Sequence, residues 1–253
     1  MPDTGLVAVA HGSTDPRAAA AIGELMPLVA ARAAERGLSV PDPRVAYLGH
    51  AAPSLPQVMS AFGPGERVTV LPLLLTAAYH SKTDIPRVLA RTGVRVRYGK
   101  PLGPHPLLLR ALERRLPGTA FEIPAETGVV LAAAGSSDPE ANATIARLAA
   151  RWQVRTGWFA VRPAYASAAT GGQGGTAGPD PATAVTRLRE AGARRVVVAS
   201  YLLAPGLFAD RIRDASLAAG AAAVSPVLGA APEVADVVLD RYMEVRSRAR
   251  AAA

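Results

Sequence analysis

The residues best suited to chemistry in this 253-residue chain are its four histidines, which all lie in the first half: His11, His50, His80 and His105. Each follows an apolar run that predicts a β-strand, and the carboxyl ends of parallel strands meet at one edge of a sheet. Neutral imidazole binds cobalt, iron, nickel or zinc, and near neutral pH it also accepts protons. The placement therefore predicts a divalent-metal site that can also perform base catalysis.

His11 begins the segment His-Gly-Ser-Thr-Asp-Pro. This segment predicts a tight turn and a helix start, with Ser13 or Asp15 as the N-cap and proline in the first turn. The side chain of His11 would then project at the carboxyl edge of the sheet, although a histidine held by the turn backbone fits the sequence equally well. The same turn could also bind an anion through backbone N–H groups.

His80 lies in the segment Tyr-His-Ser-Lys-Thr-Asp-Ile-Pro. Asp84 could orient the imidazole or cap the following helix, and capping is the commoner role. Lys82 could contact an acidic substrate, although lysines more often remain solvated. His50 is a candidate third ligand or base. His105, in Gly-Pro-His-Pro, is expected to precede a helix rather than to bind metal.

Composition limits the chemistry further. The chain has no cysteine, which excludes disulfides, thiolate metal sites and iron–sulfur clusters. The net charge of +8 suits a polyanionic partner. The arginines are nevertheless spread along predicted helices, so we expect no nucleic-acid partner. There is no basic leader and no apolar run of the roughly 18–20 residues that a membrane span needs, so we expect a cytoplasmic protein without a membrane partner.

Strands and helices alternate along the chain. Strands are expected at 6–10, 44–48, 67–75 and 94–98, with helices at 18–36 and 85–91. After a loop at 116–127, further strands are expected at 129–133, 157–161, 195–200 and 222–225, with a helix at 233–248. Apolar strands separated by helices indicate parallel sheets that are buried on both faces. The glycine-rich tract 170–179 has no phosphate-binding pattern and predicts a surface loop.

An internal repeat divides the chain into two lobes. Residues 11–16 resemble residues 134–139, and residues 73–80 resemble residues 201–208 more loosely. Duplication of one α/β unit explains both matches. We therefore predict an N-terminal lobe at 1–118 and a C-terminal lobe at 119–253.

The two copies differ where chemistry is expected. Ala134 replaces His11 and Phe208 replaces His80, whereas glycine, serine, aspartate and proline persist around the first position. The asymmetry predicts a single site in the N-terminal lobe. A nucleophile elbow, a P-loop, a dinucleotide fingerprint and an H-E-x-x-H helix are all absent from the sequence.

Taken together, three motifs resemble the class II chelatases, specifically the two-lobed sirohydrochlorin chelatases of siroheme and cobalamin biosynthesis. The motifs are H-G-S-x-D-P at 11–16, H-x-x-x-D-I-P at 80–86 and P-L-G-x-H-P at 101–106. The resemblance implies two flavodoxin-like α/β lobes that face a cleft. It also implies a lyase that inserts Co²⁺ or Fe²⁺, with Ni²⁺ as a third candidate, into a tetrapyrrole that carries many carboxylates.

Residue by residue, the resemblance makes His11 and His80 the catalytic metal ligands and proton acceptors. Relatives commonly carry a glutamate at the end of the second strand, where this chain has Gly49 and then His50, so His50 is expected as a substitute ligand. The residues expected to contact the substrate are Ser13, Tyr79 and Lys82, with Asp84 behind His80. We expect no cofactor beyond the metal substrate, and a monomer or weak homodimer.

Two alternatives remain open from the sequence. One is a non-catalytic carrier of metal or tetrapyrrole that uses the same histidines, and turnover separates it from an enzyme. The other is an α/β domain that binds a small phosphorylated ligand at the glycine-containing turn. That alternative predicts that loss of the histidines hardly affects binding.

Overall fold

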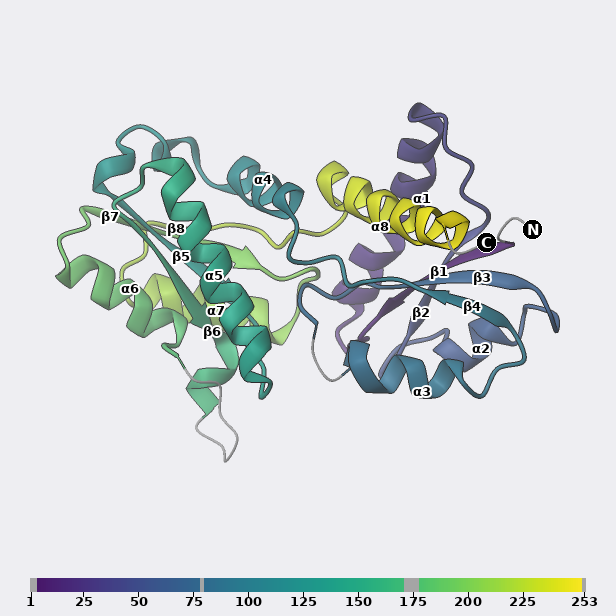
Figure 1. Ribbon diagram of the computed structural model, residues 1–253. Coiled ribbons are helices and arrows are strands. Elements are labelled where there is room, and N and C mark those ends of the chain that lie inside the picture. The colour runs from purple at the N-terminus through teal and green to yellow at the C-terminus, as the bar shows by residue number, and fades with distance from the viewer. Residues whose placement is uncertain (1–3, 78–79, 171–177, 252–253) are drawn as a thin grey trace. The chain divides into compact units, whose positions relative to one another are not determined.

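Two parallel sheets of four strands each organise the chain (Figure 1). The computed structural model describes residues 4–77, 80–170 and 178–251. The first compact unit combines residues 1–108 with 229–253, and the second comprises residues 109–228. The predicted α/β class with two parallel sheets is confirmed. Among the described residues, no helix is long and apolar enough to cross a bilayer.

The sheet of the first unit has the order β2-β1-β3-β4, which is the start of a flavodoxin-like order. Its strands are β1 (Gly5–Ala10), β2 (Pro43–Tyr47), β3 (Arg67–Pro72) and β4 (Arg95–Tyr98). Its helices are α1 (Pro16–Glu35), α2 (Leu55–Met59), α3 (Ile85–Leu89) and α8 (Pro232–Ala251). Helices α1 and α8 lie side by side on one face of the sheet, and α2 and α3 cover the other (Figure 1).

Burial of both faces explains why the central strand β1 is continuously apolar. All six residues of β1 are buried. Val7 and Val9 pack with Leu55 and Ile85 in one core cluster, which places α2 and α3 over that face. The intervening residues of the strand point to the opposite face because side chains alternate along a strand.

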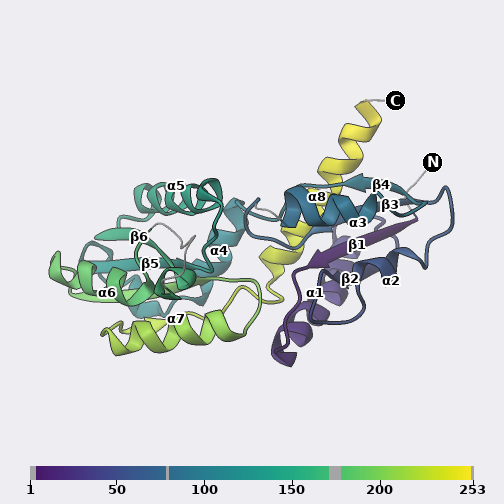
Figure 2. The same ribbon diagram turned by 90° about the horizontal axis from the view of Figure 1, so that it is seen from below.

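The sheet of the second unit repeats the same order as β6-β5-β7-β8. Its strands are β5 (Thr127–Ala133), β6 (Ala160–Tyr165), β7 (Arg195–Tyr201) and β8 (Ala223–Val224). Its helices are α5 (Pro139–Thr156), α6 (Pro181–Glu190) and α7 (Leu207–Ala218). Figure 2 shows this sheet between α5 on one side and α6 and α7 on the other.

Helix α4 (Pro106–Arg115) begins at the boundary of the two units and packs in the second. Glu113 Oε1 accepts a 2.7 Å hydrogen bond from Nε1 of Trp152, which is fully buried on α5. Trp152 also meets Trp158 edge to face, with ring centroids 4.9 Å apart. These contacts attach α4 to the core of the second unit.

The duplication appears in local geometry as well as in topology. Gly12 and Gly135, which follow β1 and β5, have φ values of +90° and +84°. Asp15 and Asp138 cap α1 and α5 with nearly the same backbone angles, φ −78° and −80°. The turn after the first strand is therefore the same structure in both copies.

The compact units have other bounds than the predicted lobes at 1–118 and 119–253. The last helix, α8, packs against α1 in the first unit, whereas α4 packs in the second. Compactness and duplication are different properties, so the boundary of the repeat near residue 118 stays a prediction.

Local expectations were wrong at two strands. The strand expected at 157–161 lies at Ala160–Tyr165, because α5 continues to Thr156 and ends at Gly157 in the left-handed conformation, with φ +68°. Strand β3 ends at Pro72 rather than at residue 75. The short helix α2 was not predicted. The centre of the expected glycine-rich loop, residues 171–177, lies outside the described residues.

Candidate functional site

The loops after β1 and β2 are joined at the carboxyl edge of the first sheet. The N–H of Leu48 donates to the carbonyl of Ala10 at 3.1 Å, and the N–H of Gly49 donates to the carbonyl of His11 at 3.2 Å. His11 directly follows β1, and both His11 and His50 are exposed. The fold therefore brings the segments that carry these two histidines next to each other.

Gly12 makes this close approach possible. Its φ of +90° is a conformation that favours glycine, and a Cβ atom at this position would lie 1.7 Å from the carbonyl oxygen of Gly49. Any larger residue would push the two loops apart. Steric crowding alone therefore explains why position 12 is a glycine, whether or not a ligand binds nearby.

The rest of the turn is held by its own polar groups. The hydroxyl of Ser13 accepts the N–H of Asp15 at 3.1 Å, and the carboxylate of Asp15 accepts the N–H of Arg17 at 2.9 Å. The side-chain hydrogen bond from Arg17 lowers the pKa of Asp15 below its ordinary value. Asp15 is confirmed as the N-cap of α1. A contact between Ser13 and a substrate stays a prediction.

His50 has a backbone conformation that is uncommon for a residue with a side chain. Its φ of +59° lies in the left-handed region, which histidine occupies more often than most residues other than glycine. Such conformations persist where surrounding contacts enforce them, and they concentrate at functional sites. The residue directly before His50, Gly49, is fixed by its hydrogen bond to the carbonyl of His11.

His80 is the first residue of a π-helical turn, His80–Asp84, which leads into α3. Such turns are rare and are often found at functional sites. The turn is anchored by buried Ser81, whose carbonyl accepts the hydroxyl of Tyr98 at 2.8 Å, and burial raises the pKa of Tyr98 far above its ordinary value. Tyr79 and the side chain of His80 lie outside what the structure describes.

Asp84 occupies the N-cap position of α3 but makes no capping hydrogen bond with its side chain, so the alternative capping role is wrong and the predicted role behind His80 stays a prediction. The physical reason is the backbone. The π-helical turn continues directly into α3 and gives Asp84 helical angles of φ −69° and ψ −50°, whereas a capping residue needs an extended conformation. Lys82, in the same turn, is exposed, and its predicted substrate contact stays a prediction.

A complete metal site is not assembled by the described residues alone. Within residues 4–77, 80–170 and 178–251, no three histidine, aspartate or glutamate residues lie close enough together to hold a metal ion. The predicted ligand set of His11, His50 and His80 needs the side chain of His80, so it stays a prediction.

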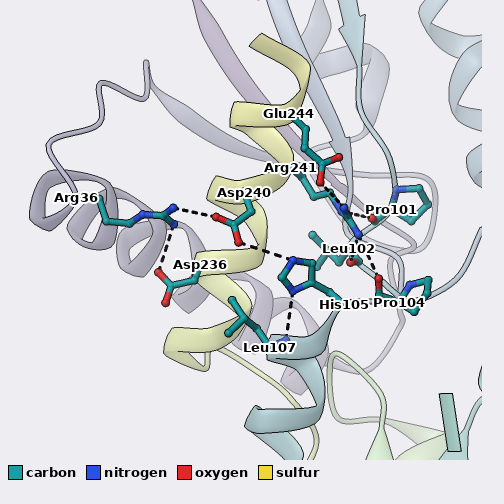
Figure 3. A network of polar contacts seen from close by, with 10 residues as sticks. All are labelled: Arg36, Pro101, Leu102, Pro104, His105, Leu107, Asp236, Asp240, Arg241 and Glu244. Atoms are coloured by element: carbon teal, nitrogen blue, oxygen red, sulfur yellow. Dashed lines mark hydrogen bonds and ion pairs between the residues drawn. The ribbon is translucent and has the colours of Figure 1, made fainter. Parts of the chain in front are cut away.

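His105 has a structural role, as expected. Its Nδ1 accepts the N–H of Leu107 at 3.3 Å at the start of α4, and its Nε2 lies 3.8 Å from a carboxylate oxygen of Asp240 (Figure 3). Burial, followed by the nearby charge of Arg241, lowers the pKa of His105, while Asp240 and Glu244 act in the opposite direction. The neutral imidazole is therefore favoured in the folded protein.

Arg241 anchors the same segment, a role that the sequence analysis missed. It donates to the carbonyls of Pro101 at 2.8 Å, Leu102 at 3.0 Å and Pro104 at 3.3 Å (Figure 3). Its guanidinium also pairs with Glu244 at 2.7 Å. No local pattern connects residue 241 with residues 101–104, so the sequence carried no signal for this contact.

The equivalent edge of the second unit lacks imidazole. The N–H of Ser167 donates to the carbonyl of Ala134, as Gly49 does to His11, so Ala168 is the counterpart of His50. A pocket of about 310 Å³ lies at this edge, and its lining includes Ser136, Ser137, Asn142 and Tyr165. Asn142 exchanges two hydrogen bonds with the backbone of Ser136, so polar groups of the pocket wall are already paired.

Two duplicated flavodoxin-like units, with histidine-bearing loops at the sheet edge of only the first, define a class II chelatase architecture. Comparison with known proteins agrees. The chain belongs to the CbiX family, whose model matches residues 5–119 and 128–245. The resemblance predicted from the three motifs is therefore confirmed.

Two relatives are similar to parts of the chain. The sirohydrochlorin cobaltochelatase of Priestia megaterium is 30% identical over 155 residues, which cover 58% of this chain and 48% of that protein. The sirohydrochlorin ferrochelatase of Bacillus subtilis (strain 168) is 27% identical over 184 residues, which cover 69% of this chain and 66% of that protein. The matches thus span about half of the first relative and about two thirds of the second.

Solved structures resemble the chain over nearly its whole length. SirB from Bacillus subtilis with Fe³⁺ has a TM-score of 0.77 and 25% identity, covering 99% of this chain and 98% of that one. A CbiX structure, described as the terminal enzyme of siroheme biosynthesis in denitrifying bacteria, has a TM-score of 0.66 and 22% identity, covering 95% and 98%. The second likeness shows the fold alone.

Proposed function

We propose that this protein is a sirohydrochlorin chelatase that inserts a divalent metal ion into the tetrapyrrole. The observation that carries the proposal is the duplicated turn. The same backbone follows β1 and β5, but only the first copy carries an imidazole, His11 against Ala134. The second copy keeps the same turn with an alanine at this position, so the turn itself needs no imidazole, which supports a chemical role for His11. The names of the relatives support the choice of substrate.

In the proposed reaction, a divalent metal replaces the two protons on the pyrrole nitrogens, and both protons are released. His11 and His80 hold the incoming metal and accept these protons, because neutral imidazole can do both. His50 serves as a third ligand where relatives commonly carry a glutamate. Ser13, Tyr79 and Lys82 contact the carboxylate-bearing substrate, and Asp84 orients His80.

The proposal also covers the metal, the cofactor requirement, the location and the oligomeric state of the enzyme. Its metal is Co²⁺ or Fe²⁺, with Ni²⁺ as a third candidate, and the relatives support both of the first two. It uses no cofactor beyond the metal substrate. It works in the cytoplasm as a monomer or weak homodimer, with the tetrapyrrole as its partner.

The test is metallation of sirohydrochlorin, followed by absorbance under anaerobic conditions with each metal in turn. Wild-type protein is expected to exceed the spontaneous rate. His11→Ala and His80→Ala are each expected to lower the catalysed rate by about 100-fold, the scale of a lost general base. His105→Gln is the matched control, because His105 precedes α4 and contacts α8. It is expected to keep the wild-type rate.

Two results would contradict the proposal. If neither histidine substitution changes the rate, the mechanism is wrong. If the protein binds metal and tetrapyrrole through the same histidines but never exceeds the spontaneous rate, it is a carrier instead.

A further inference from the structure

A single residue, His105, caps the first turn of α4. Its Nδ1 accepts the N–H of Leu107 at 3.3 Å, and its carbonyl accepts the N–H of Leu108 at 3.1 Å (Figure 3). Pro106, the first residue of the helix, has no N–H to satisfy. The backbone donors of this turn are therefore paired by the ring and the carbonyl of one histidine.

Three other helices begin with the same arrangement but with a carboxylate as the cap. Helices α1, α5 and α6 each start with an aspartate followed by a proline, and the aspartate side chain accepts a backbone N–H of the first turn. An aspartate keeps its charge down to about pH 4, whereas an imidazole gains a proton near pH 6.5. Of these four caps, the one on α4 is the cap that changes its charge at mildly acidic pH.

Protonation removes the capping interaction. A neutral imidazole that accepts a hydrogen bond at Nδ1 carries its proton on Nε2, whereas the protonated ring is a donor at both nitrogens. The N–H of Leu107 would then face a second donor instead of an acceptor. The new charge would also lie at the positive end of the α4 dipole, in a first turn that contains no acidic residue.

Charged groups on α8 set the protonation of the ring. Burial and the charge of Arg241 lower the pKa of His105 below its ordinary value of 6.5. Asp240, with a carboxylate oxygen 3.8 Å from Nε2, and Glu244 act in the opposite direction. The ring is therefore neutral at neutral pH and takes up a proton in acid.

The groups on either side of the ring are anchored. Arg241 donates to three carbonyls of the 101–104 segment, just before the ring. Asp240 pairs at 2.9 Å with Arg36, directly after α1, and Arg36 also lies 3.7 Å from Asp236. Because the preceding segment and the partner on α8 are both fixed, the first turn of α4 is the part that can respond to protonation.

We propose that His105 is an acid-sensitive switch for the first turn of α4. The neutral ring caps the turn, and the protonated ring releases the amides of Leu107 and Leu108 while the 101–104 segment and α8 stay in place. The turn lies where the chain passes from the first compact unit to the second, next to residue 108. Acid therefore loosens one of the two connections between the units without unfolding either unit. The switch does not depend on the proposed function, and its test needs neither metal nor tetrapyrrole.

The test follows two NMR signals while the pH is lowered from about 7.5 to about 5. One is the titration of the His105 ring. The other is the hydrogen-exchange protection of the amides of Leu107 and Leu108, corrected for the intrinsic effect of pH on exchange. The amide of Arg17 is the matched reference, because Asp15 caps it at 2.9 Å from two positions earlier, also across a proline. Circular dichroism checks that the protein stays folded.

We expect the protection of Leu107 and Leu108 to fall about fivefold as the ring titrates, the scale of a lost helix cap, while Arg17 keeps its protection. His105→Asn, which caps without titrating, should keep the protection of both leucine amides over the whole pH range. His105→Ala should show the low protection at every pH.

The opposite results are equally clear. If the ring stays neutral down to the pH at which the protein unfolds, or if the protection does not change across the titration of the ring, the switch is overturned. It is also overturned if Arg17 loses protection together with Leu107, since acid then acts on the whole unit. Loss of protection in His105→Asn, as in wild type, would assign the effect to another group.

Discussion

At the scale of single residues, Gly12 gives the sharpest prediction. Gly12→Ala is expected to destabilise the protein by about 2 kcal/mol or more. The φ of +90° at position 12 is strained for alanine, and the Cβ atom of the alanine would collide with the carbonyl of Gly49. Gly23→Ala is the control, because Gly23 lies inside α1 with open space around it. It should stabilise the protein by roughly 0.5–1 kcal/mol. Urea denaturation of both variants measures the difference, and equal stabilities would contradict the steric argument.

His105 predicts a dependence of stability on pH. Its pKa is lowered in the folded protein, so the unfolded chain binds more protons at mildly acidic pH. The stabilisation from the neutral imidazole is therefore fully present above its ordinary pKa of 6.5 and is lost as pH falls below that value. His105→Gln removes this contribution.

The measurement is the free energy of unfolding at pH 7.5 and pH 5.5. Wild-type protein should lose more stability between these values than His105→Gln does. A variant with the same or a steeper loss would show that His105 is not the titrating group. The charged groups around it are Arg36, directly after α1, and Asp236, Asp240, Arg241 and Glu244 on α8 (Figure 3).

Residues in local patterns could be predicted from the sequence, and residues in long-range contacts could not. Asp15 as an N-cap and His105 before a helix follow from neighbours within a few positions. The contact of Gly12 with Gly49 and the anchoring of the 101–104 segment by Arg241 depend on which elements the fold places together. The sequence left a capping role open for Asp84, because the π-helical turn that gives this residue helical backbone angles has no recognisable pattern in the sequence.

At the scale of elements, the start of α5 can be tested separately from the rest of the chain. Asp138 accepts the N–H of Glu140 at 3.0 Å, so Asp138→Ala should cost about 1 kcal/mol and Asp138→Asn only a small part of that. Both tryptophans of the chain, Trp152 and Trp158, lie in the second unit, so their fluorescence reports its unfolding. Equal midpoints for the alanine and asparagine variants would argue against capping.

Strand and helix types were predictable because their apolar patterns differ, but several boundaries were not. Helix α5 and strand β6 are separated by three residues, and the helix-ending role of Gly157 depends on its left-handed backbone. The sequence around Gly157 is compatible with an earlier strand start. Short α2 contains a proline and only five residues, too few for a helical period to be visible.

At the scale of the whole chain, the duplication was visible in the sequence but the packing of the terminal helices was not. Both α4 and α8 follow the last strand of a repeat, yet α4 packs in the second unit and α8 in the first. An amphipathic helix shows that it has a buried face without showing which sheet covers that face. The chain therefore crosses between the units twice, near residues 108 and 229.

Arg241 connects the two segments of the first unit that lie next to these crossings. It lies on α8, after the crossing near residue 229, and donates to carbonyls of the 101–104 segment, just before the crossing near residue 108. Its side chain is 10% exposed. Arg241→Ala removes the charged donor from these three carbonyls and one of the two arginine partners of Glu244. The expected cost is about 2–4 kcal/mol, borne mainly by the first unit.

The measurement is urea denaturation followed by two signals, since tryptophan fluorescence reports the second unit alone whereas circular dichroism reports both. In Arg241→Ala, part of the circular dichroism transition should move to lower urea while the fluorescence transition moves less.

Arg248→Ala is the control on the same helix, because Arg248 is 56% exposed and pairs with Glu244 only at 3.6 Å. It should change stability by less than about 0.5 kcal/mol. If both signals shift together in Arg241→Ala, the two units unfold as one cooperative structure and the anchor stabilises the whole chain.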